Sequence, residues 1–481
     1  MNYRLVFKLL SSILLLEAAT MLPSLGIALY WQSGDVMAFV LSILITAAAS
    51  LPGFLINRPE KNDLRLKEGF LTVALAWVLL SIFGALPYVF SGSLPTFADA
   101  LFEAVSGLTT TGASVMTNID GQMRGILFWR AFTHWIGGMG VLVLSLAILP
   151  SGVGRATHLM RAESPGPEFS KLLPKTQNSA KLLYALYAVL TVIEFIVLLL
   201  CGLTPYDAAI HAMSTAGTGG FSNYALSIGA FNSPVVNWVI TLFMVLFSVN
   251  FALYYRILTG HARDALRSEE LHWFLAIFIG GSIIIALNIL PLYSDLHTAF
   301  MHGFFQVASI MSTSGFATTD FNLWPQASKM LLLILMLVGA CSGSTAGGIK
   351  VVRIALLCKQ GLKSIRRYFQ PRRVSVVRFE GRAVDPPMLS QIAVYFFTFI
   401  ALFLIGAFLL CLEGKFDFTS NFTAALTCIT NVGPGFGAVG PMGSFTGYGA
   451  SSKLVLSLLM LAGRLEIFPI LALFHPAMWR K

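Results

Sequence analysis

The chain of 481 residues is poor in charge: Asp, Glu, Lys and Arg make up 11% of it, against about 25% in soluble globular domains. All five cysteines lie in or beside apolar segments without CxxC spacing, so the sequence favours neither a disulfide framework nor a zinc site. The histidines show no metal-binding spacing such as HExxH, and no Walker A motif occurs. With 56% hydrophobic residues and a mean hydropathy of +0.77, the chain is expected to be a polytopic membrane protein.

The sequence is rich in long apolar runs. Ten of them approach the roughly 20 residues that a transmembrane helix needs. They lie at about 5–31, 36–56, 70–91, 125–149, 181–203, 234–258, 272–293, 327–358 with an interruption, 389–413 and 453–474. The first run follows Arg4 and Lys8 as a signal peptide would, but Glu17 interrupts it and it continues to Trp31, so we interpret it as a retained helix.

Positively charged residues are concentrated in alternate connections between these runs. Most of the 32 lysines and arginines fall at the two termini and in the segments 58–67, 155–181, 256–267 and 350–382. The positive-inside rule places these segments and both termini in the cytoplasm. The net charge of +10 is therefore a topology signal, and contact with anionic membrane lipid explains it better than nucleic-acid binding.

Four segments between the later runs are too short and too rich in glycine to cross a membrane. They lie at 98–118, 205–224, 297–322 and 419–440, and each begins as a short apolar helix and ends in small polar residues and glycine. Aligning the ends gives Thr110-Thr111-Gly112-Ala113, Gly217-Thr218-Gly219-Gly220, Thr313-Ser314-Gly315-Phe316 and Asn431-Val432-Gly433-Pro434. Such internal similarity, at a spacing of roughly one hundred residues, predicts a repeated structural unit.

The expected fold is an all-α polytopic membrane protein with four pseudo-symmetric repeats around a central pore. Each repeat would contain a span, a pore helix, a filter loop and a second span, and two further spans would precede them. The expected divisions are 1–68 for the extra helix pair, 69–155 and 180–265 for the first two repeats, 270–360 for the third, 361–388 for a basic cytoplasmic loop and 389–481 for the fourth repeat.

Four re-entrant loops can aim rings of backbone carbonyls at a bare cation and replace its hydration shell. Glycine is needed where the backbone takes conformations that a Cβ would block. The negative ends of the pore helices would favour a cation. The candidate ion-binding residues are Thr110, Thr111, Gly112, Thr218, Gly219, Thr313, Ser314, Gly315, Asn431, Val432 and Gly433.

The sequence GACSGSTAGGIK, residues 339–350, interrupts the run at 327–358 with glycine and small polar residues. Irregular backbone at membrane depth is tolerated only where protein buries it or where it lines a water-filled cavity. We expect an obstruction of the pore formed by Gly339, Ser342, Gly343, Ser344, Thr345, Gly347, Gly348 and Lys350. Gly343 and Gly347 also form a GxxxG helix-packing motif, which is the competing interpretation.

Arg464 lies near the middle of the last apolar run, where a charge is costly. It is expected to donate to carbonyls of the obstructing loop or to act as an electrostatic barrier; the alternative is a structural pair with a carboxylate on another helix. Lys350 is expected either to hold the loop or to extend to the inner interface. Glu103, Asp207 and Asp320 would concentrate cations at the outer mouth or be solvated loop charges.

The motifs TTTGAS, GTGGFS, STSGFATT, NVGPGFG and GSTAGGIK resemble those of the Trk/Ktr/HKT superfamily of potassium transporters, most closely its bacterial TrkH/TrkG type. The resemblance covers essentially the whole chain. It implies potassium as the transported ion, with rubidium as a surrogate, through a symporter or a channel. It further implies an intramembrane gate at 339–350, a homodimer, and a TrkA-like cytosolic nucleotide-binding subunit that supplies nucleotide control, since no cofactor is expected on this chain.

Two other functions compete with uptake through a pore. The first is the potassium-translocating subunit of a pumping ATPase, which would need a pump partner. The second is a membrane-embedded enzyme, which would need converging acid, base or metal-binding residues within the bundle. Only Arg464 and Glu466 lie deep in a span, which is too few for a catalytic site. A GxGxxG match at Gly435, Gly437 and Gly440 follows a short apolar helix rather than a strand, so it does not predict dinucleotide binding.

Overall fold

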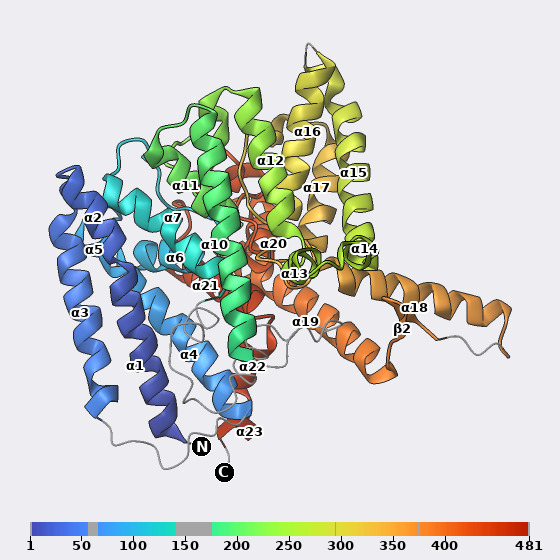
Figure 1. The fold of residues 1–481 in the computed structure, drawn as a ribbon, viewed down its shortest axis with the longest axis horizontal. Coiled ribbons are helices and arrows are strands. Elements are labelled where there is room, and N and C mark those ends of the chain that lie inside the picture. The colour runs from blue at the N-terminus through green and yellow to red at the C-terminus, as the bar shows by residue number, and fades with distance from the viewer. Residues whose placement is uncertain (1, 56–65, 141–175, 294, 373–375, 480–481) are drawn as a thin grey trace.

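The computed structural model describes residues 2–55, 66–140, 176–293, 295–372 and 376–479. Within these ranges the chain is a bundle of helices (Figure 1). The two strands described there, β1 (Arg378–Phe379) and β2 (Arg382–Ala383), form one antiparallel hairpin. The prediction of a helical, multi-pass membrane protein is confirmed at this level.

Six predicted spans appear as helices that are long and apolar enough to cross a membrane. They are Tyr3–Tyr30, made of α1 (Tyr3–Thr20) and α2 (Leu22–Tyr30); α3 (Val36–Leu55); Lys67–Phe90, made of α4 (Leu66–Gly84) and α5 (Leu86–Phe90); α10 (Thr176–Leu200); α15 (Glu269–Ile289) with the 3-10 turn η2 (Leu290–Leu292); and α19 (Pro386–Cys411). Helices α3 and α4 both pack on α1, and α1 and α3 lie at one side of the bundle (Figure 1).

Four short helices, which we call the pore helices, occupy the predicted non-spanning segments: α6 (Phe97–Leu108), α11 (Pro205–Ala216), α16 (Leu296–Met311) and α20 (Phe418–Thr430). Their N-caps are Thr96, Thr204, Asp295 and Asp417, and each side chain accepts a hydrogen bond from the backbone N–H three residues on. This is the N-cap arrangement that satisfies an otherwise unpaired helix donor. Asp207 is therefore part of a helix cap, since Thr204 donates to its carboxylate.

The other four predicted spans all break after a short helix. These second helices are α7 (Arg124–Gly138), α12 (Pro234–Ser248), α17 (Gln326–Val338) and α21 (Ala450–Arg464). An interruption was predicted only for the run that contains α17. Continuous helices at 234–258 and 453–474 are wrong: α12 bends by 90° into α13 (Phe251–Leu258), and α21 stops before α22 (Phe468–Phe474). The part of the predicted span 125–149 beyond residue 140 lies outside the described residues.

Positive φ angles mark three of these breaks. Gly140 follows α7 with φ of 82°, Gly339 follows α17 with φ of 68°, and Glu466 and Ile467 follow α21 with φ of 52° and 68°. After the break that follows α17, the helix α18 (Val351–Phe369) projects sideways from the bundle (Figure 1). The expected boundary between residues 360 and 361 therefore falls inside a helix.

The remaining elements are short. They are α14 (Ala262–Leu266), α23 (Pro476–Trp479) and the 3-10 turns η1 (Ser227–Phe231), η3 (Phe321–Leu323) and η4 (Gly437–Val439).

Candidate functional site

The four pore helices end in one shared backbone conformation. The first residue of each turn is left-handed, and the glycine two positions later also has a positive φ. The left-handed residues are Thr110 (55°), Thr218 (54°), Thr313 (58°) and Asn431 (56°), and the glycines are Gly112 (77°), Gly220 (78°), Gly315 (75°) and Gly433 (99°). A β-branched residue rarely adopts a positive φ, and such strain is typical of functional sites. We call these segments, 110–112, 218–220, 313–315 and 431–433, the four turns.

The second turn corrects the alignment made from sequence. Gly220, not Gly219, shares the backbone conformation of Gly112, so the alignment was one residue out of register there. The hydrogen bonds agree: the middle N–H of each turn donates to the carbonyl five residues back. These bonds are Thr111 to Ser106 (2.9 Å), Gly219 to Ser214 (2.9 Å), Ser314 to Ser309 (2.9 Å) and Val432 to Thr427 (3.0 Å). Gly219 therefore corresponds to Thr111, Ser314 and Val432.

The four turns close into a ring. A Cβ added to Gly112 would overlap the carbonyl oxygen of Gly219, and one added to Gly220 would overlap that of Ser314. The same relation joins Gly315 to Val432 and Gly433 to Thr111. Each glycine therefore packs on the middle carbonyl of the next turn, and no side chain fits at these four positions. Segments more than three hundred residues apart are brought together in this way.

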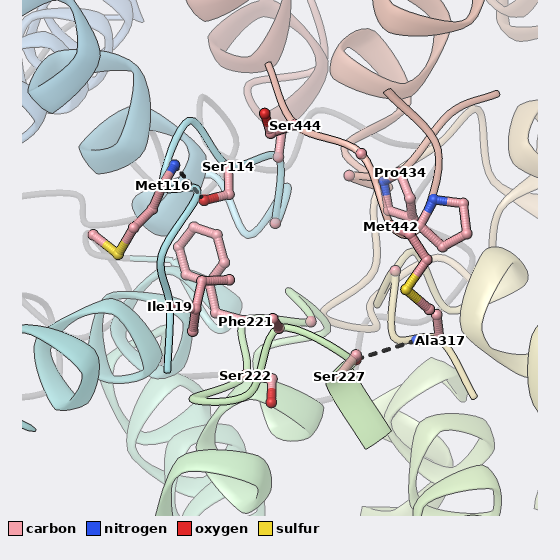
Figure 2. A pocket seen from close by; sticks show the side chains of 18 of the residues that line it. Ser114, Met116, Ile119, Phe221, Ser222, Ser227, Ala317, Pro434, Met442 and Ser444 are labelled. Atoms are coloured by element: carbon pink, nitrogen blue, oxygen red, sulfur yellow. Dashed lines mark hydrogen bonds between the residues drawn. The ribbon is translucent and has the colours of Figure 1, made fainter. Parts of the chain in front are cut away.

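A cavity of about 380 Å³ opens on the ring, and all four of these glycines line it. Figure 2 shows residues from the loop that follows each turn around this cavity: Ser114, Phe221, Ala317 and Pro434. The ring thus has one open face lined mainly by backbone and small side chains.

Residues 339–350, which we call the inserted segment, lie between α17 and α18 and contact the left-handed residues of the ring. The N–H of Gly347 donates to the Thr313 hydroxyl over 2.8 Å, and a Cβ at Gly347 would lie 3.0 Å from the Cβ of Asn431. Gly339, Gly343 and Gly348 all have positive φ. The segment is thus an irregular, mostly buried loop rather than a GxxxG helix contact.

The backbone of the inserted segment finds partners at the break between α12 and α13 and on α15. Cys341 N–H donates to Ser248 O (3.1 Å), and Phe251 N–H donates to Gly343 O (3.1 Å). Ser342 N–H donates to the Glu270 carboxylate over 2.6 Å. The Ser344 hydroxyl donates to Cys341 O over 2.6 Å. Such pairing is what lets irregular backbone persist at membrane depth.

Arg464 joins the inserted segment to the ring and to the end of α7. Its guanidinium donates to Thr345 O over 2.7 Å, to Gly138 O over 2.6 Å and to Gly137 O, and it lies 3.3 Å from the Thr110 hydroxyl. This is the predicted donation to loop carbonyls. Glu466 pairs instead with Arg353.

Lys350 is buried and donates to Ala346 O inside the inserted segment, so it holds the loop and does not extend to the inner interface.

The acidic residues assigned to the outer mouth are not free charges. Glu103 is fully buried and pairs with Arg130 over 2.8 Å, so neither interpretation made from sequence holds for it. Asp207 accepts from Asn223 as well as from Thr204. Asp320 caps η3 through Asn322 N–H. No motif in the sequence marks the role of Arg130.

Comparison with known proteins gives concordant results. The family model TrkH, described as a cation transport protein, matches residues 36–481. The chain is 36% identical over 487 residues to the Trk system potassium uptake protein TrkH of Escherichia coli (strain K12), with 100% of each chain covered. It is 34% identical to TrkG of the same strain, covering 100% of this chain and 99% of that protein.

A solved structure agrees over the whole length. The crystal structure of the potassium transporter TrkH from Vibrio parahaemolyticus superposes with a TM-score of 0.90 at 33% identity, and 100% of both chains is covered. These relatives are named as transporters and not as enzymes. The chain therefore belongs to the TrkH family of cation transport proteins.

Proposed function

We propose that this protein takes up potassium across the bacterial inner membrane through a filter formed by the four turns. The observation that carries the proposal is the closed ring in which each glycine packs on the middle carbonyl of the next turn. Backbone carbonyls presented from all sides can replace the hydration shell of a potassium ion. The potassium uptake named for relatives that match the full length supports the same function.

The ion-binding residues are the twelve positions of the four turns, with Gly220 added to those expected from the sequence. Potassium is the transported substrate, and its contacts are with the turns alone. The fourth turn departs from strict fourfold symmetry because Asn431 replaces threonine and Pro434 follows the glycine. The Asn431 amide donates to the Thr111 hydroxyl over 3.0 Å and to Met460 O over 2.9 Å. It thereby holds the fourth turn against the first turn and α21.

The inserted segment is the gate in this proposal, and Arg464 and Lys350 hold it closed. The hydrogen bonds from Arg464 to Thr345 O and to the Thr110 hydroxyl support this role, because they tie the segment to the ring. Breaking them would release the segment without altering the glycines of the ring.

The architecture we propose has ten crossings, four pseudo-symmetric repeats and both termini in the cytoplasm. The six long apolar helices supply the first spans of the repeats and the extra pair. Each of the second helices α7, α12, α17 and α21 begins one further crossing. The distribution of positive charge supports the orientation.

Nucleotide control would come from a TrkA-like cytosolic ring that docks on the basic cytoplasmic surface, and the pore subunit would be a homodimer. The basic residues of α18 and the following hairpin offer that surface. No Walker A motif occurs in the sequence, so the proposal assigns nucleotide binding to the partner.

Rubidium uptake into liposomes that contain the purified protein tests this function. We expect uptake that excess sodium does not block and that Gly315→Ser weakens or makes permeable to sodium, because a side chain at Gly315 overlaps Val432 O. If the intact protein is closed without its partner, a variant shortened within 342–348 restores the flux. No rubidium uptake by either protein would overturn the proposal.

A further inference from the structure

Arg130 and Glu103 form a buried ion pair beside the candidate filter. Arg130 lies on α7 with 1% of its side chain exposed, and Glu103 lies on the pore helix α6 with none exposed. The Nε of Arg130 is 2.8 Å from Glu103 Oε1. An ion pair in this position is costly to desolvate, so it is retained only where its hydrogen bonds are well satisfied.

The pair reaches the loops that follow the first two turns. Arg130 donates to the Ser114 hydroxyl over 3.1 Å and to Ser222 O over 3.2 Å, and its guanidinium lies 3.9 Å from the ring centroid of Phe221. Glu103 accepts from Ser114 and from Val115 N–H. Ser114 and Ser222 both line the cavity on the ring (Figure 2). One guanidinium thus bridges the first loop to the second.

Hydrogen bonds from backbone N–H groups join the other neighbouring loops. Ala317 N–H donates to the Ser227 hydroxyl, Gly437 N–H donates to Asn322, and Phe445 N–H donates to Ser114 O. The first and second loops share, besides the arginine bridge, an exposed bond from Ala225 N–H to Asp120. The buried support of this junction is therefore charged.

Matching positions in the other second helices are apolar. Arg130 is the seventh residue of α7, and the seventh residues of the equally long α12 and α21 are Ile240 and Leu456, both fully buried. The matching position on the pore helix α11, counted back from the left-handed residue, is His211, which bonds Ser222 over 3.0 Å.

A second buried cation, Lys453 of α21, pairs with Asp99 of the pore helix α6 and donates to Thr446 O of the fourth loop, so the fourth and first repeats also share a charged link. Arg130 differs because its guanidinium contacts two neighbouring loops directly.

We propose that the Arg130–Glu103 pair is a positioning clamp that sets potassium-over-sodium selectivity by fixing the first and second filter loops. The clamp rests on the proposed function and assigns it two further residues. Neither residue needs to touch the ion. If the clamp is released, the carbonyls of the first two turns can move inward and coordinate the smaller sodium ion.

The test compares rubidium and sodium uptake into liposomes for the wild type and three variants, all in the gate-shortened background. Arg130→Lys keeps the charge but replaces the planar, forked guanidinium with a compact ammonium, which cannot present the same fixed donor geometry to Glu103, Ser114 and Ser222. Arg130→Gln with Glu103→Gln removes both charges and leaves no unpaired buried ion, so this double variant keeps the fold testable. Arg124→Gln is the control, because Arg124 is exposed on the same helix and contacts Trp31 and Tyr206 instead.

We expect the rubidium-to-sodium ratio to fall about tenfold in the lysine and double variants, as for loss of one charged hydrogen bond, and to be unchanged in Arg124→Gln. A purely structural pair would lower protein yield and thermal stability at an unchanged ratio, and that result would overturn the clamp. Absence of rubidium uptake by the unsubstituted protein would instead overturn the proposed function, so the two failures are distinguishable.

Discussion

The ring and the inserted segment contain similar residue types but have opposite proposed roles, ion coordination and obstruction of the pore. Both are rich in glycine and small polar side chains, and both contain left-handed backbone. The ring repeats one conformation four times, whereas the part of the chain that the structure describes contains one such inserted segment, after α17. Coordination of an ion needs oxygen atoms on all sides, but obstruction of a pore needs a single insertion.

The two regions also differ in what stabilises them. Each turn of the ring is held by a hydrogen bond to its own pore helix, five residues back. The inserted segment is held by distant partners: Ser248 and Phe251, Glu270, and Arg464. Each turn of the ring is thus built by local structure, whereas the inserted segment depends on tertiary contacts. Substitutions of the ring glycines are expected to abolish or degrade transport, and those that remove contacts of the segment are expected to release it.

The largest effect is expected from Gly220→Ala. The added Cβ overlaps Ser314 O, and φ of 78° is unfavourable for alanine, so potassium uptake should fall by at least about tenfold. Gly280→Ala is the matched control, since a Cβ there meets nothing within 4 Å. Rubidium uptake in liposomes measures both, and equal effects of the two substitutions would remove the distinction between the ring and ordinary helix glycines.

The register of the second turn explains why this prediction concerns Gly220. Residues 217–220 read Gly-Thr-Gly-Gly, and either of the last two glycines could match Gly112 by residue type. The backbone angles and hydrogen bonds of the structure distinguish them. The three other turns were aligned correctly because each has one glycine, at the third position.

The breaks in the second helices were harder to predict. The glycine-rich sequence GACSGSTAGGIK, directly after α17, predicts a break in the helix. The end of α21 reads LAGRLEIF and contains no cluster of helix-breaking residues. There the chain turns at Glu466 and Ile467, which are poor choices for positive φ. Burial of Glu466 against Arg353 and packing of Ile467 in the core accompany this conformation. Such tertiary contacts are not visible in local sequence.

A second prediction concerns Arg464→Gln. Loss of the hydrogen bonds to Thr345 O and the α7 carbonyls should release the inserted segment and raise uptake without the cytosolic partner by about tenfold. The rubidium preference over sodium should persist, because no glycine of the ring changes. Flux that stays at the wild-type level, with and without the partner, would contradict the gating role of Arg464.

A smaller effect is expected from Thr313→Val, which removes the acceptor for Gly347 N–H but keeps the branched shape. One neutral hydrogen bond is lost, so partner-free uptake should rise by roughly threefold to tenfold. Thr313→Ser keeps the hydroxyl and is the control. If valine and serine behave alike, the bond between the ring and the segment does not contribute to closure.

The smallest effect concerns the cap of the fourth pore helix. Hydrogen bonds from Ser420 lower the pKa of Asp417 below its ordinary value of 3.8. The ionised cap therefore adds stability that is complete above about pH 4 and is lost as the pH falls through the lowered pKa. The thermal unfolding temperature of Asp417→Asn should lie below that of the wild type at neutral pH and converge with it in acid. A difference that does not shrink as the pH falls below about 3.8 would contradict this account.

The separation of selection from obstruction is tested most directly by shortening the inserted segment within 342–348 and measuring rubidium and sodium uptake in liposomes. The account predicts that uptake rises while the preference for rubidium over sodium stays as in the full-length protein, because the ring keeps its own hydrogen bonds. Uptake that rises with loss of that preference, or that does not rise, would contradict the division of roles between the ring and the inserted segment.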